Sequence, residues 1–134
     1  MQLPRGATIA VADGEKLHLF RNNGDEAHPK LVALPEPAIG GDNKSAGVRH
    51  PSSSANPNDS RLEEDSFAAA TAGWLNKEVL EGRIDNLFII AAPKSLGELR
   101  KHYHKALEAK LLGELAKDLT GHPAADIETA LANA

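Results

Sequence analysis

A mixed α/β fold is predicted by three features of this sequence. Residues 87–92 form an unbroken apolar run, which is typical of a strand covered on both faces. Three short strand patterns lie near the N-terminus, and a long helical pattern separates them from that run. Because a helical crossover joins parallel strands, residues 87–92 are expected to run parallel to a strand of the N-terminal group.

The N-terminal strands are predicted to form an antiparallel meander. The first is the apolar run 7–12, and Asp13-Gly14 follows it as a hairpin turn, since glycine accepts a positive φ. The second strand, 17–21, places its two leucines on one face, and the third covers 30–34 before two prolines. Three consecutive strands with short turns predict neighbouring positions in one sheet.

A long loop is expected at 38–59, because this segment is rich in Gly, Ser, Pro and Asn and offers almost nothing to bury. A loop of this length inside a compact domain is usually functional or disordered, and we expect a flexible one. At 134 residues, the whole chain, 1–134, is expected to form a single domain.

The helix after this loop is predicted to begin at Ser60. Ser60 and Glu63 have the spacing of a capping box, in which each side chain bonds a free backbone N–H of the other's turn. Gly82 supplies the stop at the other end. The apolar face repeats at helical spacing through Ala68, Ala72, Leu75 and Val79.

A second helix is predicted directly after the apolar strand. Pro93 ends the strand because it has no N–H to donate, and Ser95 with Glu98 has capping-box spacing. Propensity alone would continue this helix to about Leu119, whereas a strand in its second half would complete a parallel pair. A last helix follows Pro123, with Ile127, Ala130 and Leu131 facing inward.

Composition narrows the class of protein. The chain is 41% hydrophobic and 25% charged and has no cysteine, which excludes disulfides and thiolate metal sites. The net charge of −4 argues mildly against a generic nucleic-acid binder, but it leaves room for a local basic patch. The sequence shows neither a signal peptide nor an apolar run of membrane-spanning length, so we expect a cytoplasmic protein without a membrane partner.

Several sequence blocks carry a resemblance to a known family. The segment AAPKSLGELR at 91–100, preceded by Asp85 and a short apolar strand, resembles bacterial host attachment proteins. Their domain is similar to the central domain of eukaryotic and archaeal class 1 peptide-chain release factors. Further matching blocks lie at 11–14, 64–75 and 117–120, so the resemblance covers nearly the whole chain.

The resemblance implies the rest of the fold. It places a short strand near 111–117, which resolves the choice between helix and strand in that region. The expected architecture is then a mixed five-stranded sheet, made of the three-stranded meander plus two parallel strands, with three helices. This element order is that of ribonuclease-H-like folds and of the release-factor central domain.

A first candidate binding site lies in the long loop. In release factors this loop carries a Gly-Gly-Gln tripeptide, whose glutamine acts where peptidyl-tRNA is hydrolysed. The chain has Gly40 and Gly41 at the similar position, followed by Asp42. A carboxylate cannot donate the hydrogen bonds of an amide, which disfavours release activity. Lys44 and Arg49 complete the candidate loop site.

A second candidate binding site lies at the carboxyl edge of the predicted parallel strands. Asp13 follows the first strand, and Lys94, Ser95 and Arg100 follow the strand at 87–92. Ligands of open α/β sheets bind at such an edge, where Arg100 could hold an anion. The alternative is that Arg100 forms a salt bridge that pins the helix, with Asp13 or Asp118 as its partner.

A metal site or a catalytic centre is not expected. A nuclease of the ribonuclease-H-like type would need converging carboxylates around paired Mg²⁺ ions, and nothing in the pattern makes the candidates converge. His102 and His104 are two residues apart, which is poor spacing for metal ligands on a helix. The carboxylate candidates are Asp13, Glu63, Glu64 and Asp85.

The sequence therefore predicts a non-catalytic cytoplasmic binding domain without a cofactor, associated with the ribosome or RNA in a translation-linked role. One alternative is an interaction protein with a protein partner, which affects attachment to host cells indirectly. The other is an enzyme, either a peptidyl-tRNA esterase or a metal-dependent nuclease.

Overall fold

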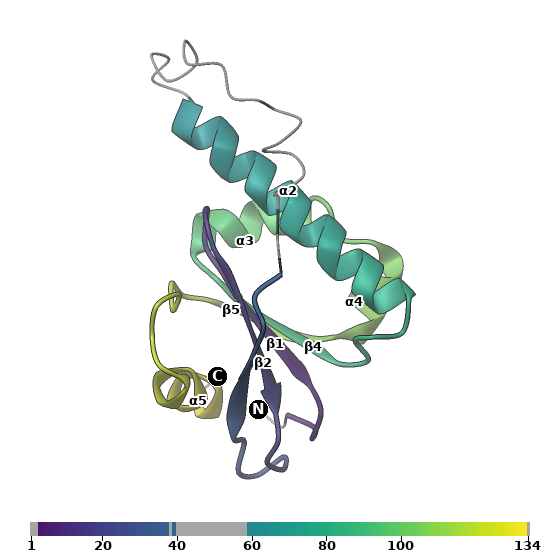
Figure 1. Cartoon of the computed structure of the whole chain (residues 1–134), viewed down its shortest axis with the longest axis vertical. Coiled ribbons are helices and arrows are strands. Elements are labelled where there is room, and N and C mark those ends of the chain that lie inside the picture. Colours follow the sequence, from purple (N-terminus) through teal and green to yellow (C-terminus); the bar gives the residue numbers. More distant parts are fainter. Residues whose placement is uncertain (1–2, 38, 40–58, 134) are drawn as a thin grey trace.

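A mixed five-stranded sheet lies at the centre of the molecule (Figure 1). The computed structural model describes residues 3–37, 39 and 59–133, and for 59–65 it describes the backbone alone. The strand order is β3-β2-β1-β4-β5. The strands are β1 (Thr8–Ala12), β2 (Leu17–Asn22), β3 (Leu31–Leu34), β4 (Leu87–Ala91) and β5 (Leu111–Ala116).

The strand directions confirm the sequence prediction. β1 pairs antiparallel with β2, and β2 pairs antiparallel with β3, so the N-terminal strands form the expected meander. β4 runs parallel to β1, with Ala12 opposite Ala91, and β5 runs parallel to β4. All five residues of β4 are buried, as the unbroken apolar run indicated. The carboxyl ends of β1, β4 and β5 consequently meet at one edge of the sheet.

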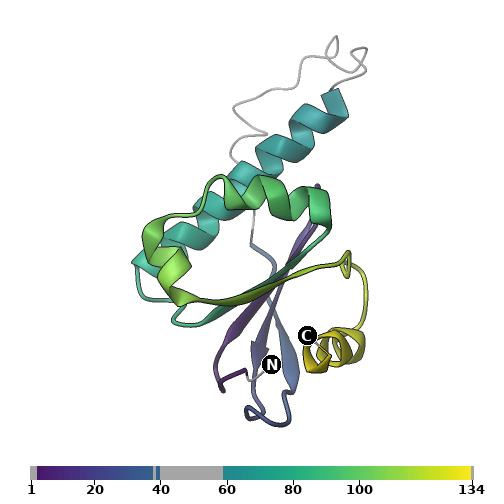
Figure 2. The same cartoon turned by 180° about the vertical axis from the view of Figure 1, so that it is seen from behind.

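Helices cover the two faces of the sheet unequally (Figures 1 and 2). Three lie on one face, which we call the helical face, and one lies on the other, which we call the α5 face. Among the described residues there are four helices: α2 (Asp59–Leu80), α3 (Pro93–Arg100), α4 (Lys105–Lys110) and α5 (Ala124–Ala132).

Alternation along the strands supplies a separate core to each face. Ala10 and Ile89 point to the helical face, where they pack with Leu75 of α2. Ile9 and Phe88 point to the α5 face, where they pack with Leu131. The centre of the sheet is therefore buried on both sides, and among the described residues one short helix covers its second face.

The long helix α2 ends as predicted and begins one residue early. Its first residue is Asp59, so Ser60 lies inside the helix rather than at its cap. At the other end, Gly82 has a φ of 80°. The Gly82 N–H donates to the Val79 carbonyl at 3.1 Å, and the Arg83 N–H donates to the Glu78 carbonyl at 2.9 Å. These two bonds form a Schellman motif, which satisfies the last carbonyls of the helix.

Helix α3 corrects the predicted capping box. The helix begins at Pro93 with Ala92 as its N-cap, and no side chain caps it. Ser95 therefore lies within the first turn and cannot serve as the cap. Proline suits the first helical position because the N–H that it lacks would have no partner there.

A fourth helix, α4, was missed by the sequence prediction. The helical pattern after Pro93 stops at Arg100, turns through 101–104 and resumes as the short α4. Asn76 of α2 clamps this turn: its amide donates to the His102 carbonyl at 2.8 Å, and its Oδ1 accepts from the His104 N–H at 2.9 Å. The His104 side chain then caps α4 by accepting from the Ala106 N–H.

The predicted last strand and last helix are present. β5 occupies 111–116, close to the range that the family resemblance implied. Pro123 is the N-cap of α5, whose Ile127 and Leu131 are buried, whereas Ala130 is half-buried. Within the parts of the chain that the structure describes, none of the helices combines the length and apolarity needed to cross a bilayer.

Candidate functional site

The loop candidates Gly40, Gly41, Asp42, Lys44 and Arg49 lie outside the described residues. The rest of the long loop predicted at 38–59 also lies outside the described residues, with the exceptions of Ile39 and Asp59. The binding role of these residues stays a prediction. The site that the structure does describe is the carboxyl edge of β1, β4 and β5.

Asp13 organises the turn that follows β1. Its Oδ1 accepts from the N–H groups of Glu15 at 2.7 Å and Lys16 at 2.6 Å. The turn therefore depends on the aspartate side chain, and Gly14 is not among the glycines with positive φ, contrary to the reason given for this hairpin. Burial raises the pKa of Asp13, but hydrogen bonds from Glu15, Thr120 and Lys16 outweigh burial and hold that pKa below its usual value.

The second oxygen of Asp13 reaches a distant segment. The Thr120 hydroxyl lies 2.8 Å from Asp13 Oδ2 and 2.8 Å from Asp118 Oδ1. A hydroxyl has one proton to donate, so it serves one of these two carboxylates at a time. The arrangement fastens the segment after β5 to the end of β1, and Asp118 is exposed there.

Arg100 has a different partner from the two that were predicted. Its Nε and one terminal nitrogen lie 3.0 and 2.9 Å from Glu114 Oε1 on β5, which corrects the expected pairing with Asp13 or Asp118. The Tyr103 hydroxyl donates to the other oxygen, Oε2, at 2.8 Å. Glu114 thus joins α3 and the turn after it to the edge strand, so the salt-bridge alternative holds with a new partner.

The shared carboxylate also changes proton affinities. The hydrogen bond with Glu114 and its charge raise the pKa of Arg100, which therefore stays a cation. Burial raises the pKa of Tyr103, and Glu114 raises it further, so this phenol stays neutral and acts as a hydrogen-bond donor. Neither group is prepared for proton transfer near neutral pH.

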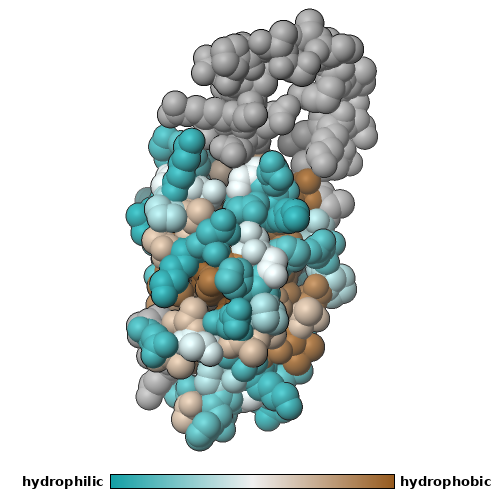
Figure 3. All heavy atoms as spheres, turned by 90° about the vertical axis from the view of Figure 1, so that its left-hand side faces the viewer, coloured by the Kyte–Doolittle hydropathy of each residue, from teal (hydrophilic) through white to brown (hydrophobic). Residues whose placement is uncertain are grey.

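The other strand-edge candidates, Lys94 and Ser95, occupy the start of α3. Lys94 is exposed and Ser95 is half-buried. They share the carboxyl edge with Asp13, because β1 and β4 are parallel neighbours, whereas Arg100 is held by β5. Figure 3 shows the molecule from this side, with hydrophilic side chains over much of the surface and hydrophobic atoms between them.

The carboxylates proposed for a nuclease do not converge. Asp13 follows the carboxyl end of β1, whereas Asp85 precedes β4, so a full strand length of roughly 20 Å separates them. Glu63 and Glu64 belong to the segment 59–65, for which the structure describes the backbone alone. Within the described part of the chain, no group of three or more His, Cys, Asp or Glu side chains could hold a metal ion.

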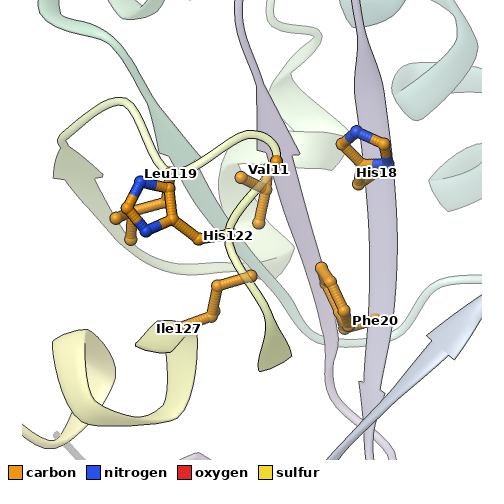
Figure 4. A pocket seen from close by; sticks show the side chains of 7 residues that line it. Val11, His18, Phe20, Leu119, His122 and Ile127 are labelled. Carbon is orange, nitrogen blue, oxygen red and sulfur yellow. The ribbon is translucent and has the colours of Figure 1, made fainter. Parts of the chain in front are cut away.

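A small hollow adjoins the strand edge on the α5 face (Figure 4). We call it the α5 hollow, and its volume is about 140 Å³. Figure 4 shows the imidazoles of His18 and His122 on either side of Val11. The apolar wall of the hollow consists of Val11, Phe20, Leu119 and Ile127, and the two histidines are its polar side chains.

Each imidazole of the hollow is held by a carboxylate. His18 Nδ1 pairs with Glu36, and His122 Nδ1 lies 3.1 Å from Asp126 Oδ2.

The sequence analysis did not predict this hollow or a role for Thr120. One signal was present: the block 117–120 follows a strand expected to lie parallel to the one before Asp13, and carboxyl ends of parallel strands meet at one edge.

The fold and this edge define a class of protein: a single small α/β domain of the release-factor-like type, with a mixed sheet and an ordered strand edge. Residues 6–131 match the model of bacterial archaeo-eukaryotic release factor family 12, so the chain belongs to this family. No curated protein matches the chain. Membership confirms the relationship to release factors, and host attachment stays a prediction.

Proposed function

We propose that this domain is a non-catalytic, translation-linked binding module that contacts ribosomal RNA through α3 and α4. The family relates the chain to release factors, which supports a role at the translation machinery. The choice of this surface rests on the distribution of charge along the sequence. Residues 94–110 hold five lysines and arginines against two glutamates, although the whole chain has a net charge of −4.

These cations are placed where a nucleic acid could reach them. Figure 2 shows α3, its turn and α4 following one another along the helical layer. The buried leucines of both helices face α2 and the sheet, so the charged side chains lie on the outer side. The exposed cations, which we call the basic helical surface, are Lys94, Arg100, Lys101, Lys105 and Lys110.

Phosphate contacts supply most of the non-specific affinity for RNA. They weaken as the salt concentration rises, because counterions released from the RNA then gain less entropy. The basic helical surface therefore predicts binding that falls steeply with ionic strength. The rigid support of this surface, through Asn76 and Glu114, would hold the cations in a constant arrangement at little entropic cost.

Co-sedimentation with ribosomes tests this proposal. Charge reversal in Lys105→Glu/Lys110→Glu should lower the fraction that sediments at low salt on the order of tenfold, because two phosphate contacts are lost. Lys30→Glu/Lys77→Glu is the matched control, since it changes the net charge equally at exposed residues elsewhere. This control should sediment like the wild type.

The competing functions give different results in the same assays. A chain that stays in the soluble fraction, with no crosslinks to ribosomal RNA, would overturn the proposal and favour an indirect role in host attachment. Hydrolysis of peptidyl-tRNA by the purified chain, abolished by Asp42→Ala, would overturn its non-catalytic part and favour the esterase. Mg²⁺-dependent RNA cleavage lost in Asp13→Asn would favour the nuclease.

A further inference from the structure

We propose that the outer edge of β5 binds an extended, acidic segment of a protein partner, which pairs with β5 as an additional strand of the sheet. The backbone of this edge supplies the hydrogen bonds, and the lysines at its two ends select the charge of the partner. The inference goes beyond RNA binding by the basic helical surface and does not depend on it.

The outer edge of β5 is open. In the order β3-β2-β1-β4-β5, this strand has β4 on one side and, among the described residues, no strand on the other. Figure 2 shows β5 in front of the other strands, with no described strand beyond it. An edge strand leaves about half of its N–H and C=O groups without a partner in the sheet, because alternate residues point outward. Such groups are a template for another strand.

The opposite edge of the sheet is protected against such pairing. Strand β3 has only four residues, and Pro35 follows it directly. The Leu31 N–H donates to Glu128 Oε2 of α5 at 2.8 Å, so a side chain already serves a backbone group of this strand. Short length, proline and a covering element are the usual means of blocking an edge strand. β5 has six residues and no proline, so the two edges differ in their capacity to accept a partner.

β5 also presents apolar surface beside its backbone. Leu112 and Leu115 are half-buried on the α5 face, whereas α5 lies next to β3 at the other edge of the sheet. Gly113 between them adds no side chain, and a glycine within a strand often marks the close approach of another backbone. Apolar side chains of an added strand would therefore lie beside the two leucines as cross-strand neighbours.

Pairing is expected mainly at residues 113–116. Leu112 is an extra residue in β5, opposite the step from Leu87 to Phe88, and such a bulge disturbs pairing locally. At the other end, the Lys117 N–H turns back to the Leu115 carbonyl at 3.1 Å, which ends the strand. A short extended segment is thus the partner that fits this edge.

Charge around β5 selects an acidic partner. Lys110 and Lys117 are exposed immediately before and after the strand. Over residues 100–118, five lysines and arginines stand against three carboxylates. Glu114, the only charged residue within β5, already bonds Arg100 and Tyr103 on the helical face. Carboxylates at the two ends of an added strand would therefore meet a lysine at each end.

A second copy of the chain fits this edge less well. Antiparallel pairing of two copies about Glu114 would place the two Glu114 side chains directly opposite each other, and like charges in this position destabilise a strand pair. Full overlap of the two strands would set Lys110 of each copy opposite Lys117 of the other. The net charge of −4 on each copy adds further repulsion.

The test uses the full chain and a capped seven-residue peptide, in which three valines alternate with two threonines between terminal glutamates. The valines lie on one face of the extended peptide and can cover the leucines of the α5 face. Titration followed by amide NMR shifts should affect residues 111–117 most. Hydrogen exchange of the outward N–H groups of β5 should slow on binding, because these groups gain partners.

Two methylated peptides separate strand pairing from other contacts. One carries N-methyl groups on the valines, and the other carries them on the threonines. Because the N–H groups of alternate residues point to the same edge of a strand, only one of these sets can face β5. One methylated peptide should therefore bind about tenfold more weakly than the parent peptide, and the other should bind like the parent.

An exchange of charge tests the two lysines. Replacing the terminal glutamates of the peptide with lysines should weaken binding about fivefold. Lys110→Glu/Lys117→Glu should reverse this preference, whereas Lys30→Glu/Lys77→Glu, which changes the net charge equally at exposed residues elsewhere, should keep it. The NMR spectrum of each variant shows whether it is folded. The assay contains no RNA, so its outcome is independent of ribosome sedimentation.

Four results would overturn the proposal. Equal binding of both methylated peptides would show that the peptide backbone does not pair with β5. Equal binding of the lysine-ended peptide would remove the selection for an acidic partner. Shifts confined to residues away from β5 would place binding elsewhere. Dimerisation of the chain alone, with slowed exchange in β5, would assign this edge to a second copy.

Discussion

The two faces of the sheet are closed in different ways. On the helical face, α2, α3 and α4 seal a continuous core, and the exposed charged residues of α3 and α4 are predominantly basic. On the α5 face, one nine-residue helix and the segments beside it cover the sheet, leaving a hollow with an acidic rim. The comparison indicates that several helices close the helical face, whereas a single helix among the described residues, with the segments beside it, is enough to bury Val11, Phe20 and Ile127 on the α5 face.

The side-chain hydrogen bonds on the two faces also connect different kinds of segments. On the helical face, Asn76 and Glu114 join elements that are already packed by buried leucines. On the α5 face, Asn22 and Glu128 bond backbone groups of the N-terminal segment and of the edge strand β3. These bonds therefore hold segments that lie outside the helices.

The strongest test of this contrast removes a core side chain from the helical face. Leu107 of α4 is 0% exposed, and Leu107→Ala should lower the free energy of unfolding by about 3 kcal/mol, through lost burial and a residual cavity. Urea unfolding measures this change. Leu80→Ala makes the same substitution at a side chain that is 57% exposed and should cost less than about 0.5 kcal/mol. Similar losses for both variants would contradict the assignment.

The next test removes the main polar lock of the α5 face. The Asn22 side chain donates to the Leu3 carbonyl at 2.8 Å and accepts from the Gly24 and Lys30 N–H groups, each at 2.9 Å. Asn22→Ala should cost about 2 kcal/mol, because buried backbone groups lose their partners. Its control is Asn23→Ala, at an exposed neighbour. A loss below that of the control would show that water replaces these bonds.

A smaller effect is expected from the polar clamp of the helical face. Asn76→Ala removes two hydrogen bonds to the turn at 101–104, but Leu99 and Leu107 stay buried on either side of it. We expect a loss of about 1 kcal/mol and faster amide exchange in this turn. Lys77→Ala on the same helix is the control. Exchange that accelerates throughout α3 and α4 would mean that the clamp, rather than the leucines, holds them.

The smallest effect is expected at the strand edge and depends on pH. The pKa of Asp13 lies below its ordinary value of 3.8 in the folded chain. Its ionised carboxylate therefore stabilises the fold above pH 3.8, and this contribution is lost as the pH falls through the folded-state pKa. Asp13→Asn should cost less than about 1 kcal/mol at pH 7, since this side chain is only half-buried and water screens its charge in part.

The measurement is urea unfolding of Asp13→Asn and wild type from pH 7 to pH 2.5. The difference between the two chains should shrink below pH 3.8, whereas Asp85→Asn, at an exposed residue, should match the wild type throughout. A difference that stays constant across this range would show that Asp13 acts through its shape rather than its charge.

The sequence by itself determined the sheet and its buried centre. The apolar run at 87–92 marks a covered strand, alternation at 17–20 assigns each side chain to one face, and Gly82 ends α2. These features depend on neighbours within a few residues, because burial follows the period of the side chains and glycine alone adopts positive φ freely. Local pattern is therefore sufficient for them.

Only the tertiary structure decided that the helix is interrupted at 101–104 and which residue pairs with Arg100. It also decided which side chains meet at the carboxyl edge of the strands. Residues 93–119 favour a helix throughout, but Asn76, 28 residues before His104, bonds the backbone at the turn. Thr120 meets Asp13 across 107 residues of sequence. Such bonds form only after packing brings distant segments together, and the energy of packing outweighs the weak local preference for helix.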